Sequence, residues 1–263
     1  MYEKELECAI YAAREAEKLI KEVYLTNFEV EIKEDDSPVT KADKLADNII
    51  REILGKNFPE YGFLTEESED NPERLKKEFI WIVDPVDGTK EFVSGNGQFT
   101  TNIALAKNGE VVVGIVNVPM FNCLYYAVKN EGAYRINPDG SKERIFVSNK
   151  KKGELRTMRS ISFFKPEEKA FLDKHKDCFA DEEIEEIGAA NKFAAIAEGR
   201  KDFFIRLSSG TKEWDVASGD LLVSEAGGIM VEPDGNKIKY NKVDVYNRKG
   251  YLIANSKENL FLD

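Results

Sequence analysis

The sequence has 263 residues, with 38 Lys and Arg against 49 Asp and Glu, so its formal net charge is −11. Hydrophobic residues make up 42% of the chain, which excludes a disordered protein and suits one large domain or two closely packed ones. The acidic balance argues against binding to a nucleic-acid polymer or an anionic membrane, because both partners require a cationic face. A substrate that is itself an anion would need another source of positive charge.

Cysteine and histidine usage narrows the chemistry further. Cys8, Cys123 and Cys178 are odd in number and far apart, which argues against a Cys-rich zinc site and a disulfide framework. With no long apolar run and a charged N-terminal segment, the chain is expected to be cytoplasmic. The single histidine, His175, lies in a charged run that predicts a solvated helix. We therefore expect neither a Ser-His-Asp nor a Cys-His mechanism.

Two amphipathic helices are predicted at the start of the chain. Apolar residues three and four apart predict a helix over residues 3–23. A second helix is predicted over residues 41–54, with Thr40 as N-cap, Asp43 at the third position and Gly55 as the C-terminal stop.

A sheet follows these helices. Residues 79–83 form an apolar run typical of a buried strand. Two hairpins come next, one of them turning at Asn108-Gly109. Their strands are predicted at residues 100–106, 111–118, 124–128 and 133–136. This half is expected to contain an antiparallel sheet.

The second half alternates between strands and helices, which predicts layered α/β packing. Strands are expected at residues 158–163, 202–207 and 229–232, and helices at residues 166–176, 189–198 and 214–226. No repeat or low-complexity linker divides the chain. We expect residues 1–148 and 149–263 to be two closely packed halves.

The most informative motif places two carboxylates at the end of the first buried strand. Asp84 and Asp87 are three residues apart across a proline, and the carbonyl of Val86 lies between them. Three hard oxygens in this arrangement suit Mg²⁺ or Mn²⁺. The amides of Gly88 and Thr89 would suit a phosphate if they open a helix. The alternative is a proline turn with an aspartate cap.

Three other acidic segments have equally simple structural explanations. Glu66 and Glu67 lie in an acidic run that could be a solvated loop. Asp215 opens an apolar helix and could be only an N-cap, although the small residues 217–219 would allow another backbone to approach. The role of Asp43 could be no more than to place a favourable negative charge in the first turn of its helix.

Taken together, the four segments resemble the inositol monophosphatase superfamily of metal-dependent, lithium-sensitive phosphatases. The matching motifs, in chain order, are Thr40-x-x-Asp43, Glu66-Glu67-Ser68, Asp84-Pro-Val-Asp-Gly-Thr89, Trp214-Asp215 and Glu225-Ala-Gly-Gly228. The resemblance covers nearly the whole chain and implies the superfamily's α/β/α/β/α sandwich.

The resemblance also implies a metal centre. Glu66, Asp84 and the Val86 carbonyl would hold one Mg²⁺, and Asp84, Asp87 and Asp215 would hold a second. A weaker third ion would lie near Glu66, and Mn²⁺ could substitute for Mg²⁺. Thr65 departs from the glycine that many members have there, but this position is not a ligand.

Catalytic and substrate-binding roles follow from the same resemblance. Asp43 and Thr89 would orient and activate the attacking water, with Glu66 as a further catalytic residue, and the Gly88 and Thr89 amides would bind phosphate. The substrate is expected to contact Glu66, Val86, Asp87, Gly88, Thr89 and Asp215. Independently of the family, metal ions can lower the pKa of a bound water and stabilise a leaving oxygen, so no histidine is needed.

Other segments resemble the CysQ branch of the superfamily, the 3'(2'),5'-bisphosphate nucleotidases. Lys90-Glu91-Phe92 stands where many inositol monophosphatases have Thr-Asn-Phe, and Asp36-Ser37-Pro38-Val39-Thr40 also fits the branch. Residues 188–193 resemble its G-S-S-x-K-F segment, with Ala189 and Ala190 replacing the serines. Lys192 would then contact the nucleotide; the alternative is a snorkelling lysine on a buried helix.

A second cation follows a predicted strand. Arg206 lies close to the position where CysQ-like chains carry arginine, although the loop before Trp214 is one residue longer. Inositol-specific enzymes tend to have a glutamate in this region, and the nearest position here is Ser208. Arg206 would suit a second phosphate on the substrate, or it could pair with a surface acid.

The sequence thus predicts a Mg²⁺-dependent phosphomonoesterase that removes the 3'-phosphate of adenosine 3',5'-bisphosphate. The alternatives are an inositol-1-phosphatase, a fructose-1,6-bisphosphatase, or a non-catalytic metal- or phosphate-binding module. The expected partner is a small phosphorylated molecule, with no nucleic-acid polymer and no membrane, and the chain would be a monomer or homodimer. Divalent ions held by the acidic residues would let an anion bind despite the net charge of −11.

Overall fold

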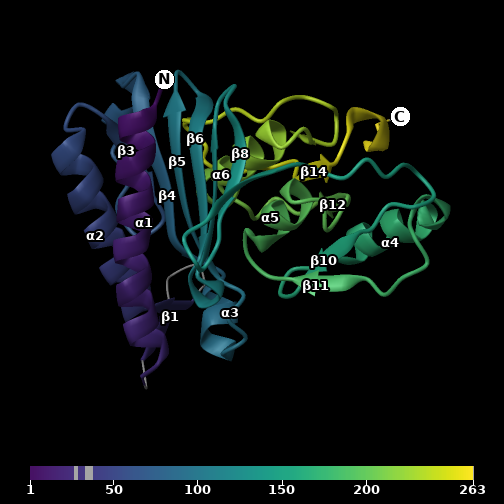
Figure 1. Cartoon of the computed structure of the whole chain (residues 1–263), viewed down its shortest axis with the longest axis horizontal. Coiled ribbons are helices and arrows are strands. Elements are labelled where there is room, and N and C mark those ends of the chain that lie inside the picture. Colours follow the sequence, from purple (N-terminus) through teal and green to yellow (C-terminus); the bar gives the residue numbers. More distant parts are fainter. Residues whose placement is uncertain (27–28, 33–37, 263) are drawn as a thin grey trace.

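The computed structural model describes residues 1–26, 29–32 and 38–262. Asp36 and Ser37 of the CysQ-like segment lie outside these residues. Two long helices, α1 (Glu3–Tyr24) and α2 (Lys41–Asn57), lie side by side and form the first layer (Figure 1). As predicted, Thr40 caps α2, because its hydroxyl accepts a hydrogen bond from the Ala42 N–H at 3.1 Å.

A seven-stranded sheet forms the second layer, with its strands in chain order. Its first two strands are parallel, and every later pair is antiparallel. The strands are β3 (Gly62–Thr65), β4 (Phe79–Asp87), β5 (Thr100–Lys107), β6 (Glu110–Val118), β7 (Cys123–Val128), β8 (Gly132–Ile136) and β9 (Lys142–Ile145). Asn108 and Gly109 both have positive φ, as the predicted β5–β6 hairpin requires.

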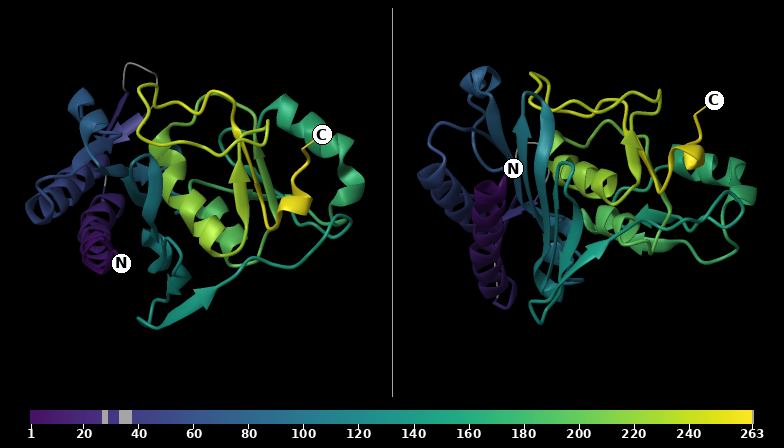
Figure 2. Two further views of the ribbon diagram at one scale, coloured as in Figure 1. Left: turned by 90° about the horizontal axis from the view of Figure 1, so that it is seen from above. Right: turned by 45° about the horizontal axis from the view of Figure 1, so that its top comes forward.

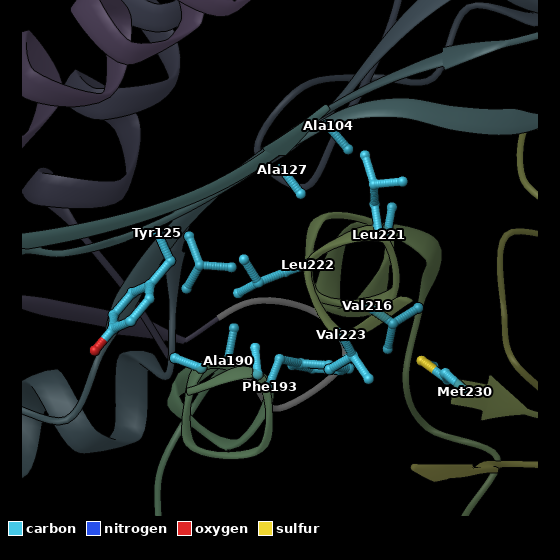
Figure 3. Packing of buried hydrophobic residues seen from close by; sticks show 14 of the residues in the cluster. Ala104, Tyr125, Ala127, Ala190, Phe193, Val216, Leu221, Leu222, Val223 and Met230 are labelled. Carbon is cyan, nitrogen blue, oxygen red and sulfur yellow. The ribbon is translucent and has the colours of Figure 1, made fainter. Parts of the chain in front are cut away.

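Helices α5 (Asn191–Ala197) and α6 (Glu213–Glu225) cover the other face of this sheet. Leu222 of α6 packs between the sheet and α5 in Figure 3. The predicted close approach at the start of α6 is confirmed. A Cβ on Gly114 of β6 would lie 2.7 Å from the Ser218 carbonyl oxygen, so only glycine fits against this turn.

A smaller sheet and an outer helix complete the layers. The strand order in this sheet is β12 (Phe203–Arg206), β14 (Tyr251–Ala254), β13 (Ile229–Val231). Helix α4 (Pro166–Lys174) lies on the far side of it (Figures 1 and 2). The five layers confirm the predicted α/β/α/β/α sandwich.

Short elements connect these layers. The short strand pairs are β1 (Val30–Ile32) with β2 (Pro38–Thr40) and β10 (Met158–Ser160) with β11 (Glu185–Ile187). The short helices are α3 (Thr89–Ser94) and the 3₁₀ segments Pro72–Lys76, Pro119–Phe121, Lys176–Cys178 and Lys257–Asn259.

Several predicted boundaries are wrong. Gly55 does not end α2, which continues to Asn57. The strand predicted over residues 158–163 ends at Ser160. The helix predicted from residue 189 begins at Asn191, because Ala189 has a φ of +50° and is left-handed.

His175 is partly buried rather than fully solvated. Its ring packs between Phe171 and Phe261, with centroid distances of 4.6 and 4.7 Å. The three cysteines are free thiols. Among the described residues, every helix is too short or too polar to cross a membrane. The division at residue 148 stays a prediction, although one apolar core contains residues from both sides of it.

Candidate active site

Three carboxylates meet where β4 ends and α6 begins. Asp84, Asp87 and Asp215 each offer one carboxylate oxygen, and these oxygens lie within 4.8 Å of one another. A register shift in β4 between Asp84 and Asp87 marks a bulge at Pro85 and Val86, as expected where a proline interrupts a strand. The bulge lets two residues three apart contribute to the same cluster.

Each carboxylate in this cluster has a different environment. Asp87 Oδ2 accepts hydrogen bonds from Asn102 Nδ2 at 3.1 Å and Thr100 Oγ1 at 3.4 Å. Asp215 Oδ2 accepts one from the Lys212 N–H at 2.6 Å, so it caps α6 and also faces the cluster. Asp84 is only 1% exposed, and its Oδ1 has no hydrogen-bond partner among the described residues.

The electrostatics of the cluster favour a bound cation. Burial raises the pKa of Asp84 well above its usual value, and the nearby Glu66, Asp87 and Asp215 raise it further. Burial likewise raises the pKa of Asp87 to about 6 and that of Asp215 to about 8. Hard divalent cations bind carboxylate oxygens. Here one such oxygen is buried without a hydrogen-bond donor and has other carboxylates around it, as in a metal site. The residues therefore fit a metal centre.

Glu66 reaches the same cavity from the neighbouring strand. It follows β3, and its N–H donates to the Val83 carbonyl of β4 at 3.2 Å. Glu66 and Val86 both line the cavity, although Glu66 lies outside the cluster of three. Their proposed ligand roles stay predictions.

The pairing of Asp43 with Thr89 is present. Asp43 Oδ2 accepts from the Thr40 N–H at 2.8 Å and hydroxyl at 2.6 Å, while Oδ1 accepts from Thr89 Oγ1 at 3.2 Å. Asp43 is 1% exposed, and burial raises its pKa. One Asp43 oxygen therefore supports the start of α2, and the other accepts from Thr89; the role of this pair in activating water stays a prediction.

Gly88 and Thr89 open a helix, as the phosphate-site interpretation required. Thr89 is the first residue of α3, and Gly88 before it is left-handed, with a φ of +89°. A Cβ on Gly88 would lie 3.1 Å from the Ala189 Cβ, so this turn packs closely against the segment before α5. Phosphate binding by these two amides stays a prediction.

Lys192 and Arg206 lie in the same cavity as the carboxylates. This cavity has a volume of about 460 Å³, and the two cations are only 5% and 4% exposed. Lys192 Nζ donates to the Ala189 carbonyl, and burial lowers its pKa to about 8, although Asp87 opposes this shift. Arg206 donates through one terminal nitrogen to the Phe163 carbonyl, and its Nε has no hydrogen-bond partner among the described residues. Neither cation is a surface residue; Arg206 lies 4.0 Å from Glu168, which is also buried.

Comparison with known proteins agrees with this geometry. The sequence profile of the Inositol monophosphatase family matches residues 1–261. The chain belongs to the inositol monophosphatase family. Its membership makes it a phosphatase, and the family is metal-dependent.

Relatives of two kinds share this fold. The chain is 34% identical to the 3'(2'),5'-bisphosphate nucleotidase CysQ of Buchnera aphidicola, over 92% of this chain and 89% of the relative. The crystal structure of CysQ from Bacteroides thetaiotaomicron matches with a TM-score of 0.83 and 30% identity, covering 97% of this chain and 98% of that one. The Nus factor SuhB of Pasteurella multocida is 33% identical, over 95% of this chain and 90% of its own length.

Several residues that shape the site were not predicted from the sequence. Asn102 and Thr100 hold Asp87 from β5, where they stand opposite Asp84 and Asp87 in the strand register. Polar residues at the start of an otherwise apolar strand were the available signal. Phe163 and Tyr246 also line the cavity, and no local motif marks either of them.

Proposed function

We propose that the chain is a Mg²⁺-dependent phosphomonoesterase that converts adenosine 3',5'-bisphosphate to AMP and phosphate. One observation carries the proposal: a single cavity is lined both by a carboxylate cluster (the acidic end) and by two buried cations, Lys192 and Arg206 (the cationic end). A substrate with two phosphates is complementary to this combination of charges. The similarity to CysQ nucleotidases supports the same choice.

Asp84, Asp87 and Asp215 would hold divalent metal, with Glu66 and the Val86 carbonyl completing the ligand set of two or three ions. Bound Mg²⁺ would supply Lewis-acid chemistry, lowering the pKa of water and offsetting the charge of the phosphate. The raised pKa values of the carboxylates in the absence of metal agree with this role, because a cation would favour their ionised forms.

The remaining chemistry belongs to residues of the chain. The Thr89 hydroxyl donates its proton to Asp43 Oδ1, so its oxygen lone pairs remain available to accept a proton from water. Water attacks phosphorus, the bond from phosphorus to the ribose 3'-oxygen breaks, and the water proton passes through Thr89 toward Asp43. The 3'-oxygen leaves with a proton from solvent, which gives AMP and inorganic phosphate.

Lys192 and Arg206 would bind the second phosphate. Both line the cavity and are almost completely buried, where a charge-assisted contact with an anion is strongest. Ser208 also lines the cavity, at the position nearest to the glutamate expected of inositol-specific enzymes. The lack of a carboxylate there favours a phosphate over sugar hydroxyls.

Phosphate release from three substrates, each with and without Mg²⁺, tests the proposal. The substrates are adenosine 3',5'-bisphosphate, inositol 1-phosphate and fructose 1,6-bisphosphate. We expect Mg²⁺-dependent release with the highest kcat/KM for the nucleotide. Faster turnover of either sugar phosphate would contradict the substrate assignment, and no Mg²⁺-dependent turnover of any substrate would favour a binding module.

A further inference from the structure

A side-chain tie joins two segments that line the cavity. Glu91 lies in α3, two residues after the proposed water-activating Thr89, and is 4% exposed. Its Oε1 accepts a hydrogen bond from the Ser162 hydroxyl at 2.6 Å. Ser162 belongs to the segment that connects β10 to α4. The bond therefore connects α3 to the segment that carries Phe163.

The residue after Ser162 forms part of the cavity wall. Phe163 lines the cavity and is 46% exposed. Lys90 Nζ lies 4.4 Å from its ring centroid, and the Arg206 guanidinium lies 5.7 Å from it. Arg206 also donates to the Phe163 carbonyl, so one cation contacts both the ring and the backbone of this residue. Together, Phe163 and Arg206 form a cationic aromatic wall.

The position of Glu91 is fixed from the other side as well. Gly188 packs so closely that a Cβ there would lie 2.9 Å from the Glu91 Cγ and 2.7 Å from the Gln98 carbonyl oxygen. The Gly188 N–H donates to Gln98 Oε1 at 2.9 Å, which holds this contact in place. Because Gly188 packs against its Cγ, the Glu91 side chain is confined, and its carboxylate meets the Ser162 hydroxyl at a fixed position.

We propose that Glu91, acting through Ser162, is a positioning residue that holds the cationic aromatic wall in place beside α3. The tie thereby selects substrates that contact both the acidic end and this wall. The identity of such a substrate rests on the proposed function; the tie itself rests on the contacts of Glu91, Ser162 and Phe163. It also gives a structural role to the Lys90-Glu91 pair, which stands where many inositol monophosphatases have Thr-Asn.

Ser162→Ala removes the tie without changing any charge. We expect KM for adenosine 3',5'-bisphosphate to rise roughly tenfold, since a lost hydrogen bond to a charged group is worth about one decade. The kcat should change little. Turnover of p-nitrophenyl phosphate, which is too small to span the cavity, should be unchanged.

Three variants separate positioning from other roles. Ser162→Thr keeps the hydroxyl and should restore the wild-type KM. Glu91→Gln keeps an oxygen that can accept from Ser162, so it should preserve most of the selectivity if the tie, and not the charge, matters. Ser94→Ala is the matched control, because the Ser94 hydroxyl donates to the Glu91 backbone carbonyl at 3.0 Å within the same helix and does not reach the wall.

The proposal is overturned if Ser162→Ala leaves the nucleotide KM unchanged, or if it raises KM equally for p-nitrophenyl phosphate. Loss of selectivity in Glu91→Gln but not in Ser162→Ala would instead assign a purely electrostatic role to Glu91. If the wild-type enzyme does not cleave the nucleotide, the proposed function fails separately. The KM of the preferred substrate is then compared with that of p-nitrophenyl phosphate. If Ser162→Ala leaves the ratio of these two KM values unchanged, the proposed role of the tie is wrong.

Discussion

The two ends of the cavity are built in different ways. At the acidic end, Asp84, Asp87 and Asp215 occupy a strand end and the first turn of a helix, so the local backbone places each of them. At the cationic end, Lys192 is held locally by the Ala189 carbonyl, whereas Arg206 contacts Phe163, which lies 43 residues away along the chain. We infer that the chemistry depends mainly on local motifs, whereas selectivity depends in part on tertiary packing.

The two ends also differ in how their buried charges are satisfied. The cations find carbonyl acceptors within the protein, Ala189 for Lys192 and Phe163 for Arg206. Asp84 Oδ1 finds no donor among the described residues and has like charges nearby. The acidic end therefore needs cations to offset its like charges, whereas each buried cation already has one acceptor within the protein. Substitutions at the acidic end should therefore impair the chemical step, and substitutions at the cationic end should impair substrate binding.

The largest expected effect comes from neutralising the acidic end. Asp84→Asn should lower Mg²⁺-dependent kcat by about 10³-fold or more, because metal stabilisation of the transition state is worth several kcal/mol. Asp87→Asn should behave similarly. Circular dichroism should show an intact fold, since asparagine has nearly the same shape as aspartate and its neutral side chain lowers the repulsion between the clustered carboxylates. Full activity in both variants would rule out the proposed metal site.

Removing the hydroxyl of Thr89 should be the next largest effect. Thr89→Ala breaks the contact with Asp43 Oδ1 and should lower kcat by roughly 10²-fold, the usual contribution of a positioned proton acceptor. Metal affinity, measured by calorimetric titration with Mn²⁺, should stay near the wild-type value. Thr89→Ser retains the hydroxyl and serves as the control. Equal losses in the alanine and serine variants would argue against the proton path.

A change at the cationic end should affect binding more than chemistry. Arg206→Gln should raise KM for adenosine 3',5'-bisphosphate by about 10- to 100-fold, as expected for a lost hydrogen bond to a buried phosphate. Its effect on kcat should be much smaller. A variant with a normal KM and a reduced kcat would show that Arg206 acts in the chemical step, which contradicts the proposed difference between the two ends.

The smallest effect concerns Asp220, a partly buried carboxylate outside the metal cluster. Asp220 lies on α6 beyond Asp215, and its Oδ2 accepts from the Tyr240 hydroxyl at 2.7 Å. Burial raises its pKa to about 6, so the folded protein binds its proton more tightly than the unfolded chain does. This contribution to stability is lost as pH rises through 6.

Compared with Asp220→Asn, the wild-type protein should therefore gain about 1–2 kcal/mol of unfolding free energy as the pH falls from 7 to 4. Urea titrations at several pH values measure this difference. Mn²⁺ affinity should be the same in both proteins. A difference in stability that does not vary with pH would contradict the assignment of this titration to Asp220.

The contrast between the two ends explains how much the sequence could predict. The Asp84–Asp87 spacing, the Thr40–Asp43 cap and the start of α6 are local patterns, and the structure brings these residues together. The tie between Glu91 and Ser162 joins residues 71 positions apart, and no periodicity marks it. The late start of α5 escaped prediction because Ala189 adopts a left-handed conformation that alanine rarely takes. Strand β14 was missed although Tyr251–Ala254 is an apolar run after Gly250; its place between β12 and β13 depends on pairing between distant segments.

The central claim is that metal-dependent cleavage at one end is coupled to recognition of a second phosphate at the other. A direct competition assay tests it, with equal concentrations of adenosine 3',5'-bisphosphate and inositol 1-phosphate incubated with the enzyme and Mg²⁺. The ratio of AMP to inositol formed gives the ratio of kcat/KM values. The account predicts that AMP predominates with the wild-type enzyme and that Arg206→Gln shifts the ratio toward inositol. A wild-type preference for inositol 1-phosphate, or a ratio unchanged by Arg206→Gln, would contradict it.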